Sequence, residues 1–134
     1  MHKNIEMYLK GDDTVDFAER AMFVSFLRSR PSWTLEHCEK LVWTDGIAGT
    51  IDAIFIDGDG RRIIVDWKRT KSMYEESLAT YQLQLNLYKT ILERNGVTCA
   101  ALMLVMLHPL NRSFCCVDVP VLDVSMYMEN AIYL

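Results

Sequence analysis

The sequence predicts an α/β domain in which a small mixed sheet is flanked by helices. Three observations predict this class. The chain has 134 residues, of which 51% are hydrophobic and 24% are charged, as in a typical globular domain. Helical and strand-like apolar patterns alternate along the chain, and glycine, proline or asparagine separates many of them. The predicted order of elements is α, α, β, β, β, α, β, β, α.

Two helices are expected before the first strand. Residues 2–10 form a short helix that ends at Gly11. A second helix is predicted from Thr14, a suitable N-cap residue, to Arg30, because apolar residues recur at helical spacing and Pro31 follows. Both helices end at residues that commonly stop a helix.

Three strand-like segments follow, over residues 36–43, 48–56 and 62–67, all rich in β-branched and aromatic residues. The turn sequence Asp57-Gly58-Asp59-Gly60 joins the second and third segments into a β-hairpin. This turn is not expected to bind calcium, because Lys68 occupies the position where a closing glutamate would lie.

The second half of the chain contains one long helix and a buried strand. Residues 75–93 are predicted to be helical, since their leucines and tyrosines fit helical spacing and Asn95-Gly96 closes the pattern. Residues 100–107 form a continuously apolar strand of the kind that is buried on both faces. A further strand is expected over residues 113–119, and a last helix from Leu122.

Nothing in the sequence divides the chain, so a single domain over residues 1–134 is expected. The longest apolar run, nine residues from Cys99 to Leu107, is too short to cross a membrane. Residues 1–13 lack the apolar core of a signal peptide. We therefore expect a soluble, intracellular protein with no membrane partner.

Cysteine usage and charge narrow the class of function. The four cysteines contain no CxxC pair and no ligand spacing, and three lie in strongly apolar surroundings, which indicates small buried side chains in a reducing compartment. They are Cys38, Cys99, Cys115 and Cys116.

The net charge of −4 argues against a protein that coats nucleic acid by bulk attraction. An enzyme whose carboxylates bind cations remains consistent with this charge.

Two carboxylates and an ammonium group are predicted to converge at one end of the hairpin. If the turn is centred near Asp59, residues whose numbers sum to 118 face each other, which places Asp52 opposite Asp66. Lys68 lies two residues beyond Asp66 and points the same way. Trp67 has the opposite parity and is expected in the core.

This trio suits metal-assisted hydrolysis of a phosphodiester. Carboxylates would hold Mg²⁺ or Mn²⁺, and a nearby lysine would orient or deprotonate the attacking water or neutralise charge on the phosphate. The alternative interpretation of Asp52, Asp66 and Lys68 is a surface salt bridge at the hairpin end. Burying such groups among aliphatic residues does not serve stability alone, which favours a functional site.

Three ordered segments of the chain resemble the GxxD, (D/E)xK and QxxxY motifs of RecB-like nucleases in the PD-(D/E)XK superfamily. They are Gly49-Thr50-Ile51-Asp52, Val65-Asp66-Trp67-Lys68, and residues 81–88 with Gln84 and Tyr88. The resemblance covers about residues 1–107. It implies a restriction-endonuclease-like αβββαβ core over about residues 14–107, with residues 108–134 as a C-terminal extension.

The resemblance also implies roles for single residues. Asp52 and Asp66 would bind Mg²⁺ or Mn²⁺ together with the backbone carbonyl of Trp67, and Lys68 would complete the catalytic set. Gln84 and Tyr88 would face the substrate. Their alternative is a place in the core, where tyrosines at helical spacing with leucines are often found.

A further metal ligand is implied on the first helix. His2 matches the histidine of RecB-like members, and Glu6 lies one turn later on the same face. A ligand at the second residue would fray unless residues precede it, and Glu19 or Glu39 could take its place. No iron–sulfur cluster is expected, because members that carry one need four cysteines at spacings this chain lacks.

Five of the 14 cationic residues fall in one short stretch, which suits either phosphate contacts or a solvated rim. They are Arg61, Arg62, Lys68, Arg69 and Lys71, of which Arg69 and Lys71 are the expected substrate-binding residues.

The resemblance implies a deoxyribonuclease, specifically an exonuclease acting on single strands or ends, with DNA favoured over RNA as partner. The chain could also be one domain of a larger replication or repair protein. The alternatives are an RNA endonuclease of the cap-snatching type and a nuclease-like module that binds nucleic acid without cutting.

Overall fold

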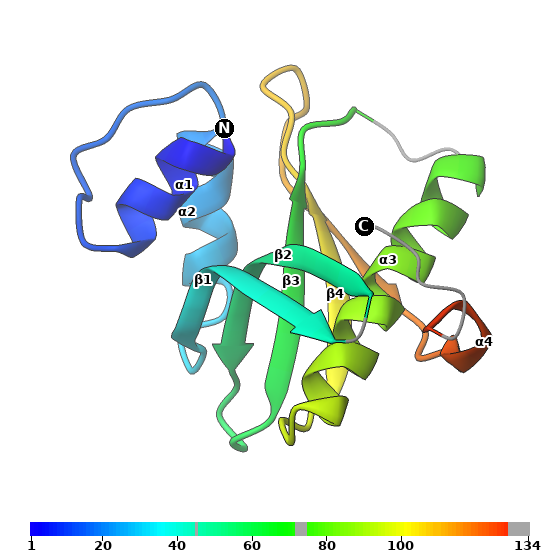
Figure 1. The fold of residues 1–134 in the computed structure, drawn as a ribbon. Coiled ribbons are helices and arrows are strands. Elements are labelled where there is room, and N and C mark those ends of the chain that lie inside the picture. Colours follow the sequence, from blue (N-terminus) through cyan, green and yellow to red (C-terminus); the bar gives the residue numbers. More distant parts are fainter. Residues whose placement is uncertain (45, 72–74, 129–134) are drawn as a thin grey trace.

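A mixed five-stranded sheet forms the centre of the protein in a computed structural model that describes residues 1–44, 46–71 and 75–128 (Figure 1). The strands lie in the order β1-β2-β3-β4-β5. Only β3 and β4 run parallel, and the other neighbours are antiparallel. The strands are β1 (Thr34–Thr44), β2 (Ile47–Ile56), β3 (Arg62–Lys68), β4 (Ala101–Met106) and β5 (Cys115–Val119).

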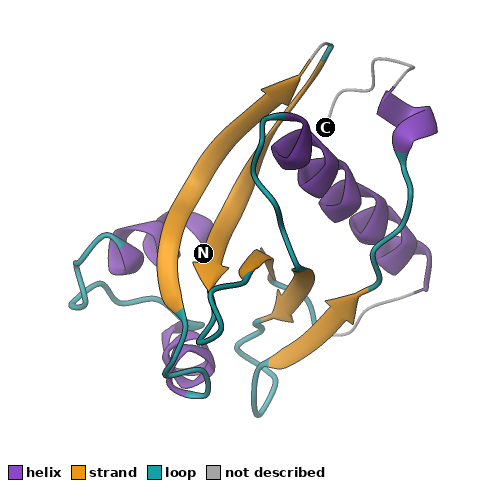
Figure 2. Cartoon of the chain, turned by 90° about the horizontal axis from the view of Figure 1, so that it is seen from below, coloured by secondary structure: helices purple, strands orange, loops and turns teal. Residues whose placement is uncertain are grey.

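Helices cover both faces of this sheet, with α1 and α2 on one side and α3 on the other (Figures 1 and 2). The helices are α1 (His2–Leu9), α2 (Arg20–Arg28), α3 (Glu75–Arg94) and α4 (Ser125–Met128). The predicted fold class and order of elements are confirmed. None of the helices in the described part of the chain is long and apolar enough to cross a membrane.

The second helix begins at Arg20, so the expected start at Thr14 is wrong. The Thr14 hydroxyl and backbone N–H both donate to the Asp12 carboxylate, at 2.6 and 3.2 Å. The Arg20 guanidinium donates to the carbonyls of Asp13 and Val15, at 2.8 and 3.1 Å. Side chains thus satisfy backbone groups of this segment, which holds it in an irregular conformation instead of a helix.

The hairpin between β2 and β3 has the predicted register. Ala53 pairs with Val65 and Ile56 pairs with Arg62. The Asp57 carboxylate accepts the backbone N–H groups of Asp59 and Arg61, both at 2.9 Å, which closes the turn. Predicting the register from the turn sequence was therefore sufficient to place Asp52 and Asp66 on neighbouring strands.

Beyond Ala53, β2 leaves β3 and continues paired only with β1. The diverging part of the β1–β2 ribbon packs against α3 through Val42, Ile47 and Ile51, all buried. The two strands β2 and β3 therefore form a fork. Asp52 is the first residue of β2 beyond the paired region, so it lies where the fork opens.

Strand alternation sorts the core into two clusters. Residues such as Ile54, Ile64 and Leu104 face α3. Trp67 faces α1 and α2 with 1% of its surface exposed, and its ring makes edge contacts with Phe23 and Phe26 at 5.4 and 5.5 Å. The predicted core position of Trp67 is confirmed, as is burial of the β4 strand, whose residues from Leu102 to Met106 are all buried.

The C-terminal end of α3 closes as predicted. Gly96 has a φ of +84°, and the N–H of Val97 donates to the carbonyl of Leu92 at 2.9 Å, which is the αL geometry that ends many helices. The last helix begins later than expected, at Ser125, whose N–H donates to the Asp123 carboxylate at 3.0 Å. Residues 129–134, which the prediction included, lie outside the described residues.

The cysteines were predicted to be buried, and this is right only for Cys99. Cys38 and Cys116 are half-buried, and Cys115 is exposed. The physical reason is that β5 is an edge strand, and Cys115 lies at its beginning, beyond the cover of the helices. All four thiols are free.

Replacing the buried tryptophan tests this description of the core. Trp67→Ala should lower the free energy of unfolding by about 3–5 kcal/mol, because it removes a fully buried aromatic ring and leaves a cavity. Urea unfolding measures the change. Trp43→Ala is the matched control, since Trp43 is 63% exposed and its loss should cost less than about 0.5 kcal/mol. Equal losses in the two variants would contradict the core assignment.

Candidate metal and catalytic site

The predicted site residues meet at the fork between β2 and β3. Asp52 comes from β2, and Asp66 and Lys68 come from the end of β3. The first residue of α1, His2, approaches the fork from one side of the sheet, and α3 approaches from the other (Figure 1). Four elements that are distant in sequence therefore contribute to one site.

His2, Asp52 and the backbone of Trp67 form one connected group. Asp52 Oδ2 accepts the N–H of Trp67 at 2.8 Å. His2 Nε2 lies 3.1 Å from the same oxygen and 2.9 Å from the carbonyl oxygen of Trp67. Both neighbours are acceptors, so Nε2 carries a proton in this arrangement, and the hydrogen bond to Asp52 raises the pKa of His2.

Asp66 is the buried carboxyl group of the site, with 5% of its surface exposed. Burial and then the negative charge of Asp52 raise the pKa of Asp66 to about 7. Burial also acts to raise the pKa of Asp52, but the hydrogen bonds from His2, Asp66 and Trp67 outweigh it and keep that pKa below its usual value. At neutral pH the pair therefore resists carrying two negative charges without a cation.

Lys68 supplies one such positive charge, with Nζ 2.7 Å from Asp66 Oδ2. The contact is an ion pair, and the buried Oδ2 atom has no further hydrogen-bond partner among the described residues. A buried oxygen of this kind is unusual in a folded protein. A buried carboxylate oxygen whose charge is balanced only by Lys68 among the described residues is consistent with a ligand atom for a cation.

α3 presents Gln84 and Tyr88 towards the carboxylates. Gln84 Nε2 donates to the Tyr88 hydroxyl at 3.0 Å. Tyr88 is 4% exposed, and burial followed by the charges of Asp66 and Asp52 raises its pKa to about 12. Tyr88 is thus both a core residue and a neighbour of the site, so the two alternatives considered for it are compatible.

Tyr81 contacts Lys68 directly, although no role in the site was predicted for it. The Lys68 Nζ atom lies 4.0 Å from the centroid of the Tyr81 ring. Tyr81 precedes Gln84 by three positions and Tyr88 by seven, so all three lie on one face of α3. This helical spacing from the QxxxY motif is the signal that could have identified it.

The cationic stretch is divided by the fold. Arg62 and Lys68 are at opposite ends of β3, about 20 Å apart for a strand of this length. Arg61 pairs with Asp57, and Arg62 pairs with Glu36, each at 2.9 Å. Of the two interpretations of this stretch, Arg61 and Arg62 therefore fit the solvated rim and not phosphate contacts beside the site, because the hairpin carries them away from it.

Arg69 and Lys71 remain near the end of β3. Arg69 Nε donates to Glu19 Oε1 at 2.6 Å, and Glu19 is 4% exposed, so this acid holds the segment after β3 against α2. Lys71 is exposed, and its carbonyl accepts the amide of Asn111 at 3.1 Å. Glu19 is therefore engaged by Arg69 and does not join the carboxylates of the fork.

The other two acids considered for the site differ from Glu19. Glu6 pairs with Lys3 and Lys10 at 3.0 and 2.9 Å. Glu39 has a φ of +50°, a rare conformation for a residue other than glycine, and burial followed by the charges of Asp52 and Glu6 raises its pKa. Glu39 thus lies close enough to the fork for the charge of Asp52 to affect its pKa.

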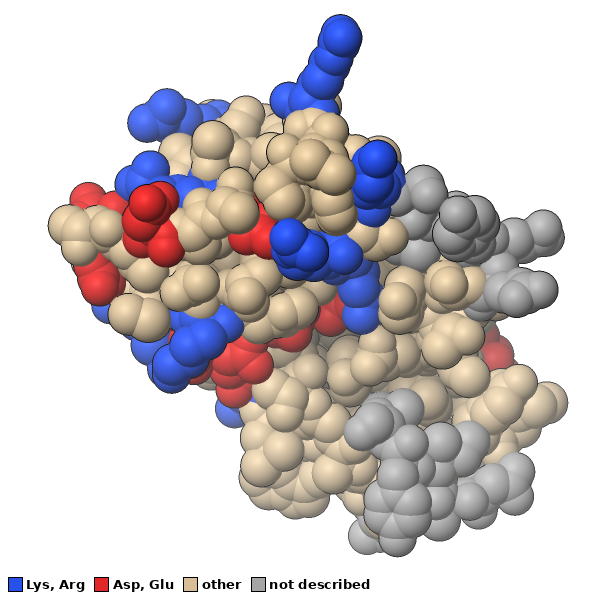
Figure 3. Space-filling view, turned by 90° about the horizontal axis from the view of Figure 1, so that it is seen from above, with Lys and Arg blue, Asp and Glu red and all other residues tan. Residues whose placement is uncertain are grey.

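The surface at this end of the molecule is recessed. Figure 3 looks down on the end of the sheet where β3 finishes, and acidic side chains are visible within a hollow that Lys and Arg side chains flank.

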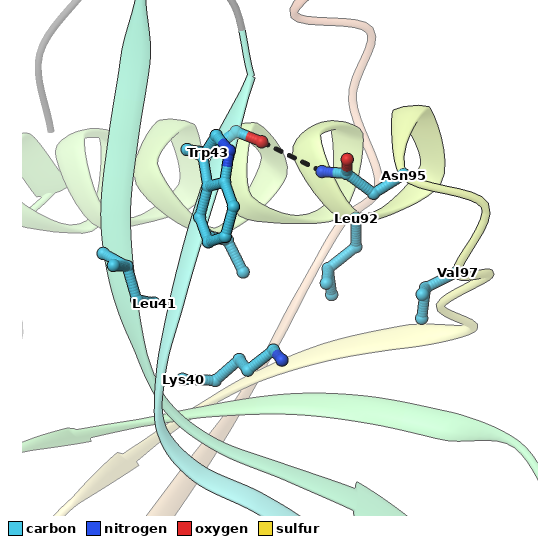
Figure 4. Close-up of a pocket in the computed structure, with 7 residues that line it drawn as sticks. Lys40, Leu41, Trp43, Leu92, Asn95 and Val97 are labelled. Atoms are coloured by element: carbon cyan, nitrogen blue, oxygen red, sulfur yellow. Dashed lines mark hydrogen bonds between the residues drawn. The ribbon is translucent and has the colours of Figure 1, made fainter.

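A separate apolar hollow of about 160 Å³ lies beside the C-terminal end of α3 (Figure 4). There the Asn95 amide donates to the Trp43 carbonyl at 2.9 Å and fastens the β1–β2 ribbon to α3. None of the predicted site residues lines this second hollow.

The atoms at the fork have the chemistry that a divalent cation requires. No group of three or more His, Cys, Asp or Glu side chains within the described ranges already surrounds a metal-sized space. Three possible metal ligands are present when the Trp67 carbonyl oxygen is counted with His2 Nε2 and Asp52 Oδ2. The proton on His2 Nε2 lies between the two oxygen atoms. A cation could replace that proton, and the buried Asp66 oxygen adds a further oxygen ligand of the type that Mg²⁺ and Mn²⁺ prefer.

Comparison with known proteins places this arrangement in a family. Residues 8–118 match the model of the PD-(D/E)XK nuclease superfamily. The chain belongs to this superfamily. Its members use divalent metal ions, usually Mg²⁺ or Mn²⁺. The superfamily predicted from the three motifs is confirmed, whereas the RecB-like branch remains a prediction.

One solved structure agrees at the level of the fold, and a second has a lower similarity. The crystal structure of SSO0001 has a TM-score of 0.53 and 20% identity, and the match covers 97% of this chain and 54% of that one. The structure of an EndoMS–dsDNA2 complex has a TM-score of 0.36 and 17% identity, with 72% and 47% covered. The chain spans about half the length of these two structures. No curated protein matches it significantly.

The raised pKa of Asp66 predicts that the folded state loses stability as the pH rises towards 7. Folding raises the pKa of Asp66 from 3.8 to about 7, so between these values the folded state keeps a proton that the unfolded state releases. The stability contributed by Asp66 is therefore fully present below pH 3.8 and is lost as the pH rises towards 7. Asp66→Asn should abolish this loss and be more stable than the wild type at pH 8 in EDTA.

Urea unfolding from about pH 4 to 8 measures the difference between wild type and Asp66→Asn. Mg²⁺ or Mn²⁺ at pH 8 should stabilise the wild type more than the variant, because the cation relieves the repulsion between Asp52 and Asp66. Asp59→Asn, at an exposed position of the hairpin turn, is the control and should follow the wild type. An Asp66→Asn variant that is less stable than wild type at pH 8 would contradict this account.

Proposed function

We propose that the protein is a metal-dependent nuclease of the RecB-like branch that hydrolyses phosphodiester bonds in DNA, as an exonuclease acting on single strands or ends. The observation that carries the proposal is the convergence of His2, Asp52, Asp66 and Lys68 at one fork, where the buried Asp66 carboxyl group lies 2.7 Å from the Lys68 ammonium group. The superfamily match supports nuclease chemistry.

Each residue has a distinct task in this proposal. His2, Asp52, Asp66 and the Trp67 carbonyl would hold Mg²⁺ or Mn²⁺, which when bound supplies a Lewis acid that activates water and neutralises phosphate charge. Lys68 would hold the attacking water or offset charge on the phosphate. Asp66 would give up the proton that its raised pKa retains, which favours cation binding at neutral or higher pH.

Substrate contacts would come from α3 and from the segment after β3. Tyr88 lies beside the carboxylates and accepts a hydrogen bond from Gln84, and Arg69 and Lys71 follow directly after the end of β3. Arg69 is 53% exposed even though it pairs with Glu19, so its guanidinium can still reach a phosphate.

Two alternative functions remain distinct from this proposal. An RNA endonuclease of the cap-snatching type also uses a helix histidine with acids and a lysine, but the Gln84 and Tyr88 pair supports the RecB-like branch. A nuclease-like module that binds without cutting is disfavoured by the presence of Asp52, Asp66 and Lys68. Since the chain spans about half of the structures it resembles, it could serve as one domain of a larger replication or repair protein.

Cleavage assays test the proposal directly. End-labelled single-stranded DNA, duplex DNA and matched RNA are incubated with Mg²⁺, Mn²⁺ or EDTA. The wild type should degrade single-stranded DNA from an end only with metal, and Asp66→Ala or Lys68→Ala should lower the rate by on the order of 10²- to 10³-fold or more. Asp59→Ala and Lys40→Ala are the charge-matched controls away from the fork.

The pattern of products decides between the alternatives. Cleavage of RNA alone would favour the endonuclease alternative, and internal cuts in DNA would overturn the exonuclease assignment. Intact substrates with tight, metal-independent binding would replace the enzyme by the non-cutting module. Unfolding of Asp66→Ala or Lys68→Ala would remove both residues from an open site.

The role of His2 has a separate measurement. His2→Ala should weaken Mn²⁺ binding on the order of 10- to 100-fold, because it removes a nitrogen that joins Asp52 and the Trp67 carbonyl. Calorimetric titration of Mn²⁺ into the protein gives the dissociation constant. His37→Ala is the control, since His37 lies on β1 beside Glu36. Unchanged Mn²⁺ affinity in His2→Ala would exclude His2 from the ligand set.

A further inference from the structure

The side chain of Lys68 is held at two points, and only one of them is a charge. Nζ lies 2.7 Å from Asp66 Oδ2 and 4.0 Å from the centroid of the Tyr81 ring. The Lys68 side chain is 21% exposed, so the ring covers part of an ammonium group that water would otherwise surround. The negative face of an aromatic ring attracts a cation at this distance.

A lysine at the end of a strand needs such a second contact. β3 fixes the backbone of Lys68, but four rotatable carbons separate the backbone from Nζ, and the strand does not restrict them. The ion pair with Asp66 is also conditional, because a cation that binds Asp66 competes with Lys68 for the same carboxylate. The Tyr81 ring carries no charge to lose, so its contact with Nζ persists when Asp66 is engaged.

α3 places this ring with the rest of the site. Tyr81, Gln84 and Tyr88 occupy one face of the helix, with Tyr81 over Lys68 and Tyr88 beside the carboxylates. Tyr81 is half-buried and packs against the core cluster between α3 and the sheet, which restrains its ring. Docking of α3 therefore sets the position of the lysine as well as that of Tyr88.

We propose that Tyr81 is a positioning residue for the nuclease reaction: its ring face holds the Lys68 ammonium at the fork while Asp66 is engaged by a cation. This inference rests on the proposed nuclease function. It concerns the π face of the ring and not the hydroxyl, which separates it from a role in substrate hydrogen bonding.

Two variants distinguish the ring from the bulk of the side chain. Tyr81→Phe keeps the π face and should leave kcat within about twofold of wild type. Tyr81→Leu keeps apolar volume without a π face and should lower kcat about tenfold with little change in KM, in single-stranded DNA cleavage with saturating Mg²⁺. Urea unfolding identifies any loss of stability that would confuse the comparison.

Fluorinated phenylalanines at position 81 provide the readout that packing alone would not move. Progressive fluorination weakens the negative face of the ring with little change in shape, so kcat should fall stepwise along the series if the ring holds the cation. In the metal-free protein, ring-current shifts of the Lys68 side-chain protons in NMR spectra should be present in wild type and Tyr81→Phe and absent in Tyr81→Leu.

The outcomes separate this proposal from the nuclease assignment. A wild type that cleaves DNA while the fluorinated series keeps a constant kcat would overturn the role of the Tyr81 ring and leave the nuclease intact. Equal losses of kcat in Tyr81→Phe and Tyr81→Leu would assign the effect to the hydroxyl and also overturn it. A wild type that cuts no nucleic acid with any metal would overturn the nuclease function itself, and the positioning role with it.

Discussion

The hydrogen bond from the Trp67 N–H to Asp52 Oδ2 is the interaction on which the site depends. It forms where the backbone ladder between β2 and β3 stops, so a side chain takes over the bonding that a strand would have provided. The carbonyl of the same residue contacts His2, and its ring packs among Phe23 and Phe26. Trp67 thus connects the aromatic core with both Asp52 and His2 at the fork.

This connection explains how a short first helix can deliver a site residue. Ile5 is fully buried and the Tyr8 ring makes an edge contact with Phe23 at 5.3 Å, so α1 is anchored by the same aromatic cluster that holds Trp67. His2 lies one turn before Ile5 and is carried to the fork by that packing. The core therefore does not merely support the site, because it also fixes the distance between two of its groups.

The sequence was most informative where local rules operate. The period of two and the turn at Asp57 were enough to derive the hairpin register and hence the meeting of Asp52 and Asp66. The same reasoning failed for Thr14, where side chains compete for backbone groups. It left phosphate contacts and a solvated rim open for Arg61 and Arg62, and the fold favours the rim because both lie at the opposite end of β3 from the site. Helical spacing from the QxxxY motif could place Tyr81 on the face of α3 that meets the site. Its contact with Lys68 and the raised pKa of Asp66 still depend on burial and side-chain conformation, which spacing alone does not determine.

The unusual backbone of Glu39 has a consequence for solubility. β1 is an edge strand of 11 residues, and an edge of that length with exposed Leu41 and Trp43 offers a template on which another chain could add a strand. The register shift near Glu36 and the positive φ at Glu39 interrupt the regular spacing of its outward backbone groups. A straight intermolecular strand cannot pair along the whole edge, so the irregularity beside the fork also protects the protein against edge-to-edge aggregation.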